Sequence, residues 1–173
     1  MPAFPALLRT SRVRLRPLGE HDVSLLCAAF RHNAARLAPW REQKDDSLTH
    51  TAMWIADEQA AWALGSRKTL LLLRGDAERS ILWGQVTLTL DAARRSAELG
   101  FWVDAEVEGK GIAFEALTAV IDYARAQLGL GRGEAIVRAD NLRCRRLLER
   151  LGFVGAPPVD PSTIEWVYVR EPL

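Results

Sequence analysis

The sequence is short of the residues that mark several large classes of protein. It has only two cysteines, Cys27 and Cys144, both within helix-like patterns, so we expect no disulfide framework. Its three histidines, His21, His32 and His50, lack the spacing of metal ligands, and we expect no metal site. No run approaches the ~20 apolar residues of a membrane span, and the first residues lack the charged start of a secretory signal. These absences predict a cytoplasmic protein that does not bind a membrane.

An excess of charge of one sign is also missing, because 23 lysines and arginines balance 22 aspartates and glutamates. A net charge of +1 therefore gives no reason to expect DNA as a partner. Hydrophobic residues make up 49% of the 173 positions, which is ordinary for a globular chain. The sequence contains no low-complexity tract or linker, so we expect a single domain over residues 1–173.

Hydrophobic periodicity predicts a mixed α/β fold. Alternating or dense apolar residues predict strands at 12–16, 69–73, 81–90, 97–103, 134–138 and 163–170. Helical spacing predicts helices at 20–31, 48–64, 114–128 and from 140 to about 151. In the second helix the spacing favours an apolar stripe of Met53, Ala56, Ala60 and Leu64. We expect the second, third and fourth strands to form an antiparallel meander, and the strand–helix–strand unit that follows to add a parallel strand.

The most informative segment lies between the predicted strand at 97–103 and the predicted helix at 114–128. It reads Val107-Glu108-Gly109-Lys110-Gly111-Ile112-Ala113. Two glycines let a ligand approach the backbone closely, and the first helical turn offers unpaired N–H groups at the positive end of the helix dipole. This combination favours a phosphate group. The spacing fits neither the Walker pattern nor the full dinucleotide pattern, in which a third glycine would replace Phe114.

The segment 108–113 resembles the pyrophosphate loop of the GNAT acetyltransferases, usually Gln/Arg-x-x-Gly-x-Gly/Ala, with Glu108 in place of the Gln or Arg. Other stretches are similar to the RimJ/RimL branch of this superfamily, the ribosomal-protein N-acetyltransferase-like proteins. They are Arg12–Leu18, Leu37–Trp40, Glu98–Val103 and Asp140–Phe153. The resemblance implies a sheet of about six to seven strands, with an antiparallel meander and a parallel pair splayed by the cofactor, flanked by four helices.

The resemblance also implies an acetyl-CoA-dependent N-acetyltransferase, in which a primary amine attacks the thioester directly in a ternary complex. The acceptor could be a protein N-terminus or a small molecule, and a homodimer is compatible with this branch. Backbone groups of Phe101 and Val103 would bind the pantetheine arm, and Asn141 would contact it or simply cap its own helix. The pyrophosphate would bind the N–H groups of Gly109, Lys110, Gly111, Ile112 and Ala113.

The reaction needs a base for the amine proton and a donor for the oxyanion, and the departing thiolate benefits from an acid. Glu98 is the first candidate for the base, because strand alternation turns it away from the apolar Leu99, and Glu165 is the second. Cys144 is a candidate acid at the Ser position of the family, since an ordinary thiol has a pKa of ~8.5. It also fits a buried helical stripe, so a structural role stays open. Tyr168 is the alternative acid.

Trp40 follows Pro39 in an irregular stretch and has two interpretations, as part of the acceptor pocket or as packing against the next helix. Glu108 and Cys144 depart from the family pattern and keep a second function open, that of a catalytically inactive regulatory module that binds acyl-CoA. A phosphotransferase is disfavoured, because the chain has no Walker or Mg²⁺-ligand motif.

Overall fold

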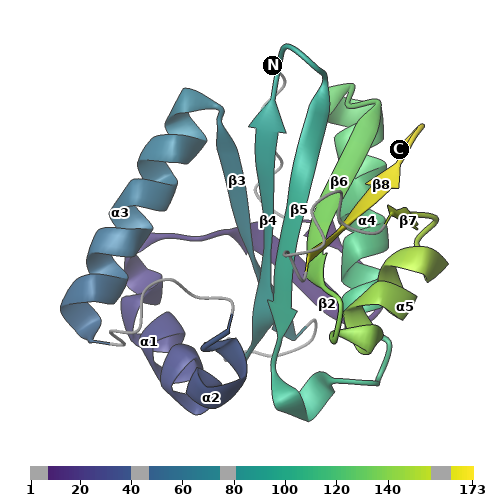
Figure 1. Cartoon of the computed structure of the whole chain (residues 1–173). Coiled ribbons are helices and arrows are strands. Elements are labelled where there is room, and N and C mark those ends of the chain that lie inside the picture. The colour runs from purple at the N-terminus through teal and green to yellow at the C-terminus, as the bar shows by residue number, and fades with distance from the viewer. Residues whose placement is uncertain (1–7, 40–46, 75–80, 157–164) are drawn as a thin grey trace.

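The computed structural model describes residues 8–39, 47–74, 81–156 and 165–173, and the structural statements below concern these parts of the chain. Their strands form one eight-stranded sheet in the spatial order β1-β2-β3-β4-β5-β6-β8-β7 (Figure 1). The strands are β1 Leu8–Arg9, β2 Val13–Pro17, β3 Arg67–Arg74, β4 Leu82–Asp91, β5 Ser96–Val103, β6 Arg132–Arg138, β7 Val154–Ala156 and β8 Glu165–Arg170. The helices are α1 Val23–His32, α2 Ala34–Leu37, α3 Leu48–Leu64, α4 Ile112–Leu128 and α5 Leu142–Arg150, with 3₁₀ turns η1 Glu20–Asp22 and η2 Ala105–Val107.

The strand pairing confirms the predicted mixed α/β fold. Strands β2, β3, β4 and β5 pair antiparallel in chain order, which is the expected meander with the first strand added at its edge. Strand β6 then lies parallel to β5, on the far side of the crossover through α4. The short edge strands β1 and β7 are additions to the prediction, because two or three residues are too few to show a periodicity.

Helices cover both faces of the sheet, and each face has its own core. Helices α4 and α5 pack on one face, and α4 lies behind the sheet in Figure 1. Helices α1, α2 and α3 pack on the other face. Helix α3 lies over β3, whereas α1 contacts β4 and, through Phe30, the Trp102 ring of β5. The all-leucine strand β3 is divided between the two cores, with Leu70 and Leu72 on the α4 side and Leu71 and Leu73 on the α3 side. Burial on both faces explains why this strand shows no polar alternation.

Helix α3 has the predicted bounds, but the predicted apolar stripe is wrong. Met53 and Leu64 are 60% and 84% exposed, and the buried side contains Thr51, Ile55 and Glu58 instead. The physical reason is an ion pair: the Glu58 carboxylate accepts a hydrogen bond of 2.6 Å from Arg67 Nη1, and another from the Thr69 hydroxyl. These contacts to β3 turn the Glu58 side of the helix toward the sheet. Among the described helices, none combines the length and hydropathy of a membrane span.

Candidate active site

The two parallel strands separate at the middle of the sheet. Strands β5 and β6 pair only from Ser96 to Glu98, whereas β5 continues to Val103. The Asp104 N–H donates to the carbonyl of Trp83 on β4 at 2.8 Å. Successive residues of a strand point their backbone N–H and C=O groups to opposite neighbours. Since Asp104 bonds to β4, the backbone groups of Val103 and, two residues earlier, Phe101 face away from β4. Both residues predicted to bind the pantetheine arm therefore turn their backbone groups toward the opening between β5 and β6.

The glycine-containing segment follows this opening, and both of its glycines adopt a backbone conformation that other residues avoid. Gly109 and Gly111 have φ angles of +75° and +78°, in the left-handed region that favours glycine. Helix α4 begins at Ile112, two residues earlier than predicted, with Gly111 as its N-cap and no side-chain cap. The Lys110 N–H donates to the Val107 carbonyl at 3.3 Å. The N–H groups at the start of α4 lack intrahelical partners. We call residues 108–113, which the sequence predicts to bind a phosphate, the phosphate-binding loop.

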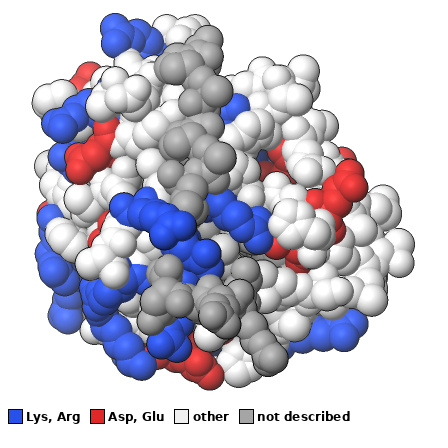
Figure 2. Space-filling view, turned by 180° about the vertical axis from the view of Figure 1, so that it is seen from behind, with Lys and Arg blue, Asp and Glu red and all other residues white. Residues whose placement is uncertain are grey.

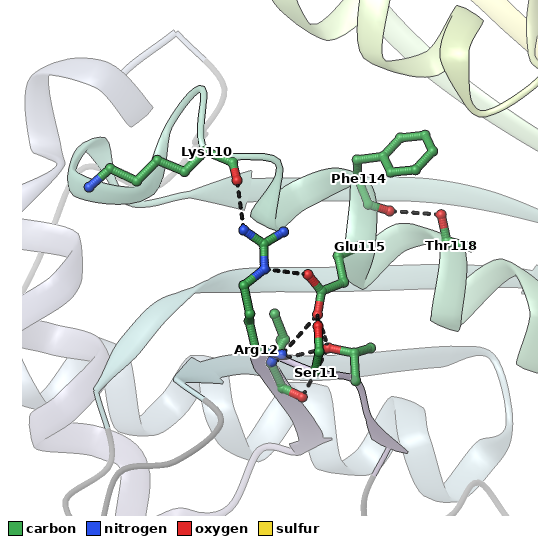
Figure 3. A network of polar contacts seen from close by, with 8 residues as sticks. Ser11, Arg12, Lys110, Phe114, Glu115 and Thr118 are labelled. Atoms are coloured by element: carbon green, nitrogen blue, oxygen red, sulfur yellow. Dashed lines mark hydrogen bonds and ion pairs between the residues drawn. The ribbon is translucent and has the colours of Figure 1, made fainter.

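Glu115 fixes the far end of this loop to the turn between β1 and β2 (Figure 3). Its Oε1 accepts hydrogen bonds from the hydroxyls of Thr10 and Ser11 and, at 2.9 Å, from the Arg12 N–H. Its Oε2 accepts from Arg12 Nε at 2.6 Å, while Arg12 Nη1 donates to the Lys110 carbonyl at 3.0 Å. Partial burial alone would raise the pKa of Glu115, but these hydrogen bonds outweigh it and lower the pKa to about 2.

Glu108, the residue that departs from the family pattern, lies at the near end of the loop between two helices. Its Oε2 is 3.1 Å from Arg36 Nη2 on α2, and its Oε1 is 2.8 Å from Arg143 Nη1 on α5. Two guanidinium groups thus compensate the carboxylate that would otherwise repel a pyrophosphate.

Arg36 joins this end of the loop to the opening beside β5. Its Nη1 donates to the Val103 carbonyl at 3.2 Å and to Asn33 Oδ1 at 3.1 Å. Asn33 in turn donates to Asp104 Oδ2 at 2.8 Å, and both residues are buried. Burial raises the pKa of Asp104, but its hydrogen bonds with Asn33 and the Glu106 N–H, together with nearby positive charge, lower it overall. A fixed negative charge and one cation therefore lie at the end of β5, and the cation is bonded to the Val103 carbonyl.

Glu98 lies where β5 and β6 stop pairing, and it is exposed on the face opposite to the buried Leu99, as predicted. Gly100 and Trp102 follow on the same face, directly across from Thr87 and Gln85 of β4. The Gln85 amide donates to the Thr87 hydroxyl at 3.2 Å, but its buried Oε1 has no hydrogen-bond partner among the described residues.

Asn141 and Cys144 together form the start of α5. Asn141 Oδ1 accepts a hydrogen bond of 3.1 Å from the Cys144 N–H, so Asn141 caps the helix, one of its two predicted roles. The cysteine packs against the core on the α4 side, and burial raises the pKa of its thiol to about 12. This environment favours the structural interpretation of Cys144.

The other predicted site residues are Tyr168, Glu165 and Trp40, and only the side chain of Tyr168 is among the described groups. Tyr168 is fully buried, and its hydroxyl accepts from Arg145 Nε at 2.9 Å and donates to Glu149 at 3.2 Å. The backbone of Glu165 pairs with Arg138, whereas its side chain is not among the described groups. Trp40 lies outside the described residues. Across the described ranges, no group of three His, Cys, Asp or Glu side chains could hold a metal ion.

Sequence reasoning missed the side chains that hold the loop in place. Arg12 was assigned only to a strand, and neither Glu115 nor Arg36 carried a motif. The partners Arg12 and Glu115 are 103 residues apart, and Arg36 and Glu108 are 72 apart. No local pattern reports contacts at such separations, so only the fold reveals them.

Comparison with known proteins identifies the family. The family described as an acetyltransferase (GNAT) domain matches residues 12–154. Because this match covers most of the chain, the chain belongs to the GNAT acetyltransferase family, as the loop and the separated strands indicate.

Individual relatives agree with the predicted RimJ/RimL resemblance. YdaF of Bacillus subtilis (strain 168), provisionally named a ribosomal N-acetyltransferase, is 31% identical over 147 residues, which cover 82% of this chain and 78% of the relative. The ribosomal protein uS5-alanine N-acetyltransferase of Escherichia coli (strain K12) is 28% identical over 153 residues, with coverage of 84% and 77%. Among solved structures, RimL, a ribosomal L7/L12 alpha-N-protein acetyltransferase in complex with coenzyme A, has a TM-score of 0.86 at 18% identity and covers 95% of this chain and 97% of its own. At that identity, the likeness shows a shared fold.

Proposed function

We propose that this chain transfers the acetyl group of acetyl-CoA to a primary amine, and that the acceptor is the N-terminal amine of a protein. The observation that carries the proposal is the opening between β5 and β6, which lies directly before the phosphate-binding loop. The two relatives described above are named as ribosomal N-acetyltransferases, which supports a protein acceptor.

In this proposal the chain binds the donor mainly through its backbone. Phe101 and Val103 pair with the pantetheine amides as a missing strand would, and the N–H groups of Gly109, Gly111 and the first turn of α4 bind the pyrophosphate. Lys110 adds a positive charge beside it, and Asn141 borders the pantetheine side while it caps α5. Arg36 leaves the Val103 carbonyl when an amide N–H of the pantetheine arm takes that position.

Glu98 is the group that we assign to the proton of the amine. The amine nitrogen forms a bond to the thioester carbonyl carbon, the carbon–sulfur bond breaks, and Glu98 receives the amine proton directly or through a water molecule. A backbone N–H that faces the opening stabilises the oxyanion. Glu98 suits this task because it is exposed at the point where the two strands separate. Glu165 stays the second candidate.

No side chain is assigned to protonate the departing thiolate. Cys144, with a pKa of about 12, is a poorer acid than the thiol that it would have to protonate, whose ordinary pKa is ~8.5. The Tyr168 hydroxyl is buried and already bonded to Arg145 and Glu149. We therefore propose that the thiolate takes its proton from solvent, although Cys144 and Tyr168 stay testable candidates.

The acceptor amine approaches over the β4–β5 face that carries Glu98. Gly100 has no side chain on this face, which leaves room between Glu98 and Trp102, and the unpaired Gln85 Oε1 offers an acceptor for an N–H of the substrate. Trp40 follows α2 in the sequence, and an acceptor role for it is part of the proposal.

The test is thiol release from acetyl-CoA in the presence of two acceptor panels, N-terminal peptides of ribosomal proteins and small primary amines. We expect turnover with at least one peptide. Glu98→Gln should lower kcat by about 100-fold without changing the Kd of acetyl-CoA, whereas Glu20→Gln, an exposed carboxylate distant in sequence, should leave both unchanged. Binding of acetyl-CoA without turnover in either panel would instead favour the inactive binding module.

A further inference from the structure

A chain of hydrogen-bonded side chains crosses the sheet on the face that α3 covers. It links Glu58 of α3, Thr69 of β3, and Thr87 and Gln85 of β4, and these two strands lie side by side in Figure 1. The Thr69 and Thr87 hydroxyl oxygens are 3.2 Å apart, and Gln85 Nε2 is 3.2 Å from the Thr87 hydroxyl. The chain therefore joins a buried carboxylate to Gln85, whose buried Oε1 has no hydrogen-bond partner among the described residues.

The carboxylate at one end fixes the direction of every hydrogen bond in this chain. Glu58 is paired with Arg67 at 2.6 Å, and an ionised carboxylate only accepts hydrogen bonds. The one hydroxyl hydrogen of Thr69 is therefore used in its bond to Glu58, so Thr69 accepts from the Thr87 hydroxyl. Since the hydrogen of Thr87 is then also used, its oxygen accepts from the Gln85 amide. The Gln85 side chain consequently turns its NH₂ into the chain and leaves its Oε1 as an acceptor.

The chain lies on the face of the sheet over which we propose that the acceptor approaches. Thr69 and Thr87 are directly opposite each other in the β3–β4 register and alternate with Leu70 and Leu88, which belong to the core on the α4 side. Figure 2 shows the molecule from behind, on the side of α4, where Lys and Arg gather over the centre and lower left of the surface. The sheet separates the chain from this basic surface, so the unpaired oxygen of Gln85 suits a hydrogen-bond donor rather than the anionic cofactor.

Gln85 and Glu98 are too far apart for one amine nitrogen to contact both. Glu98 lies opposite Thr89 of β4, which is four residues from Gln85 on the same face. At ~3.4 Å per residue these two positions of β4 are about 13 Å apart, and strand side chains stand roughly perpendicular to the sheet. An extended peptide covers ~3.3–3.6 Å per residue. A peptide whose N-terminal amine lies at Glu98 would therefore bring the N–H of one of its next few residues to Gln85.

We infer that Gln85 binds a backbone N–H of a peptide acceptor, a few residues after the N-terminal amine, and that Glu58, Thr69 and Thr87 are positioning residues that fix the Gln85 amide for this contact. A buried acceptor without a partner costs free energy, and an incoming N–H removes that cost. The contact favours a peptide over a small amine. It thus specifies the acceptor class of the proposed function, on which the inference rests.

The experiment compares two acceptors that share their first residue. One is an N-terminal tetrapeptide amide of the ribosomal protein whose peptide the wild type acetylates best, and the other is the corresponding amino acid amide. Gln85→Ala, Thr87→Val and Thr69→Val should each raise the KM of the tetrapeptide about tenfold, the effect of one hydrogen bond, with kcat changed by less than about twofold. The KM of the amino acid amide should stay unchanged. Glu58→Gln, whose amide donates as well as accepts, should raise the KM of the tetrapeptide about threefold.

Two controls separate positioning from a general structural effect. An unchanged Kd of acetyl-CoA in calorimetry shows that a variant is folded, and Thr118→Val removes a hydroxyl that donates to the Phe114 carbonyl within α4, so it should leave both KM values unchanged. In the double variant Thr87→Val/Gln85→Ala, the KM of the tetrapeptide should be no higher than in Gln85→Ala alone, because Thr87 acts only through the Gln85 amide.

The possible failures are distinguishable. KM values that stay unchanged, or that rise equally for both acceptors, would overturn the contact between Gln85 and the peptide. A double variant about tenfold worse than Gln85→Ala would show that Thr87 acts independently and would overturn the positioning role. Turnover of small amines without turnover of any peptide would overturn this inference and leave acetyl transfer standing. No turnover with any acceptor would overturn this inference and the proposed function together.

Discussion

Glu115 and Glu108 lie at opposite ends of the phosphate-binding loop, and arginine side chains hold each of them. The Glu115 side chain is 17% exposed and accepts hydrogen bonds from three consecutive residues of one turn, Thr10, Ser11 and Arg12. The Glu108 side chain is 32% exposed and is shared between Arg36 and Arg143, which come from different helices.

Glu115 and Glu108 show that a carboxylate beside a predicted anion site can either anchor the backbone or set the local charge. Ion pairs between exposed side chains contribute ~0–1 kcal/mol to stability, so the contacts of Glu108 are exchangeable and mainly set the local charge. A carboxylate with several hydrogen bonds contributes more, because its donors are left unpaired when it is removed. Glu115 therefore shapes the loop, and under the proposed function Glu108 would tune how strongly the loop attracts phosphate.

The largest effect should come from Glu115→Gln. The amide would place its own N–H groups against the donors of Thr10 and Arg12, so the loop would lose its anchor. We expect the Kd of acetyl-CoA to rise about tenfold and the free energy of unfolding to fall by about 2 kcal/mol. Calorimetry and urea unfolding measure these changes, and Glu106→Gln, an exposed carboxylate before the loop, is the control. An unchanged Kd would show that the loop needs no anchor.

The pH dependence of stability should report the same carboxylate. The pKa of Glu115 is lowered to about 2 in the folded chain from an ordinary value of 4.5. Its contribution to stability is therefore complete above pH 4.5 and is lost as the pH falls through about 2. The difference in unfolding free energy between the wild type and Glu115→Gln should shrink over this window. A difference that stays constant would mean that the charge is not what stabilises the turn.

A smaller effect of the opposite sign is expected for Glu108→Gln. The substitution removes a negative charge from the loop and frees Arg36 and Arg143 for the phosphates. The Kd of acetyl-CoA should fall about threefold, with the free energy of unfolding changed by less than ~1 kcal/mol. The gain should disappear at high salt. A weaker affinity in this variant would reverse the comparison, because Glu108 would then be the more important anchor.

The smallest effect is expected for Cys144→Ala, which tests whether the thiol takes part in the reaction. Since a thiol with a pKa of about 12 is a poor acid, kcat should change by less than about twofold. A loss of ~100-fold at saturating acetyl-CoA would restore Cys144 as the acid.

The sequence predicts the parts of this molecule that depend on local pattern. The meander and the outward direction of Glu98 follow from a period of two residues, and the glycines at 109 and 111 mark the loop between a strand and a helix. The stripe of α3 could not be predicted in this way, because the buried Glu58 depends on Arg67 and Thr69 of another strand. The spacing of apolar residues predicts which side of a helix is buried only where that buried side is itself apolar.

The candidate site also has features that depend on local pattern and features that depend on distant contacts. The loop between β5 and α4 is predictable, since glycines and helix ends are encoded nearby, and its phosphate stays a prediction. The compensation of Glu108 by Arg36 and Arg143 depends on three separate elements, and a sequence reader can only infer that some partner must exist.

The separation of β5 from β6 also has a signature in hydrogen exchange. The amide hydrogens of Phe101 and Val103 point into the opening and should exchange rapidly with deuterium while no ligand is bound. Those of Gly100 and Trp102, one residue away on the same strand, point toward β4 and should exchange slowly throughout. A ligand that pairs with β5 in the opening would slow exchange only at Phe101 and Val103. The amides of Gly100 and Trp102 on the same strand then serve as the internal reference.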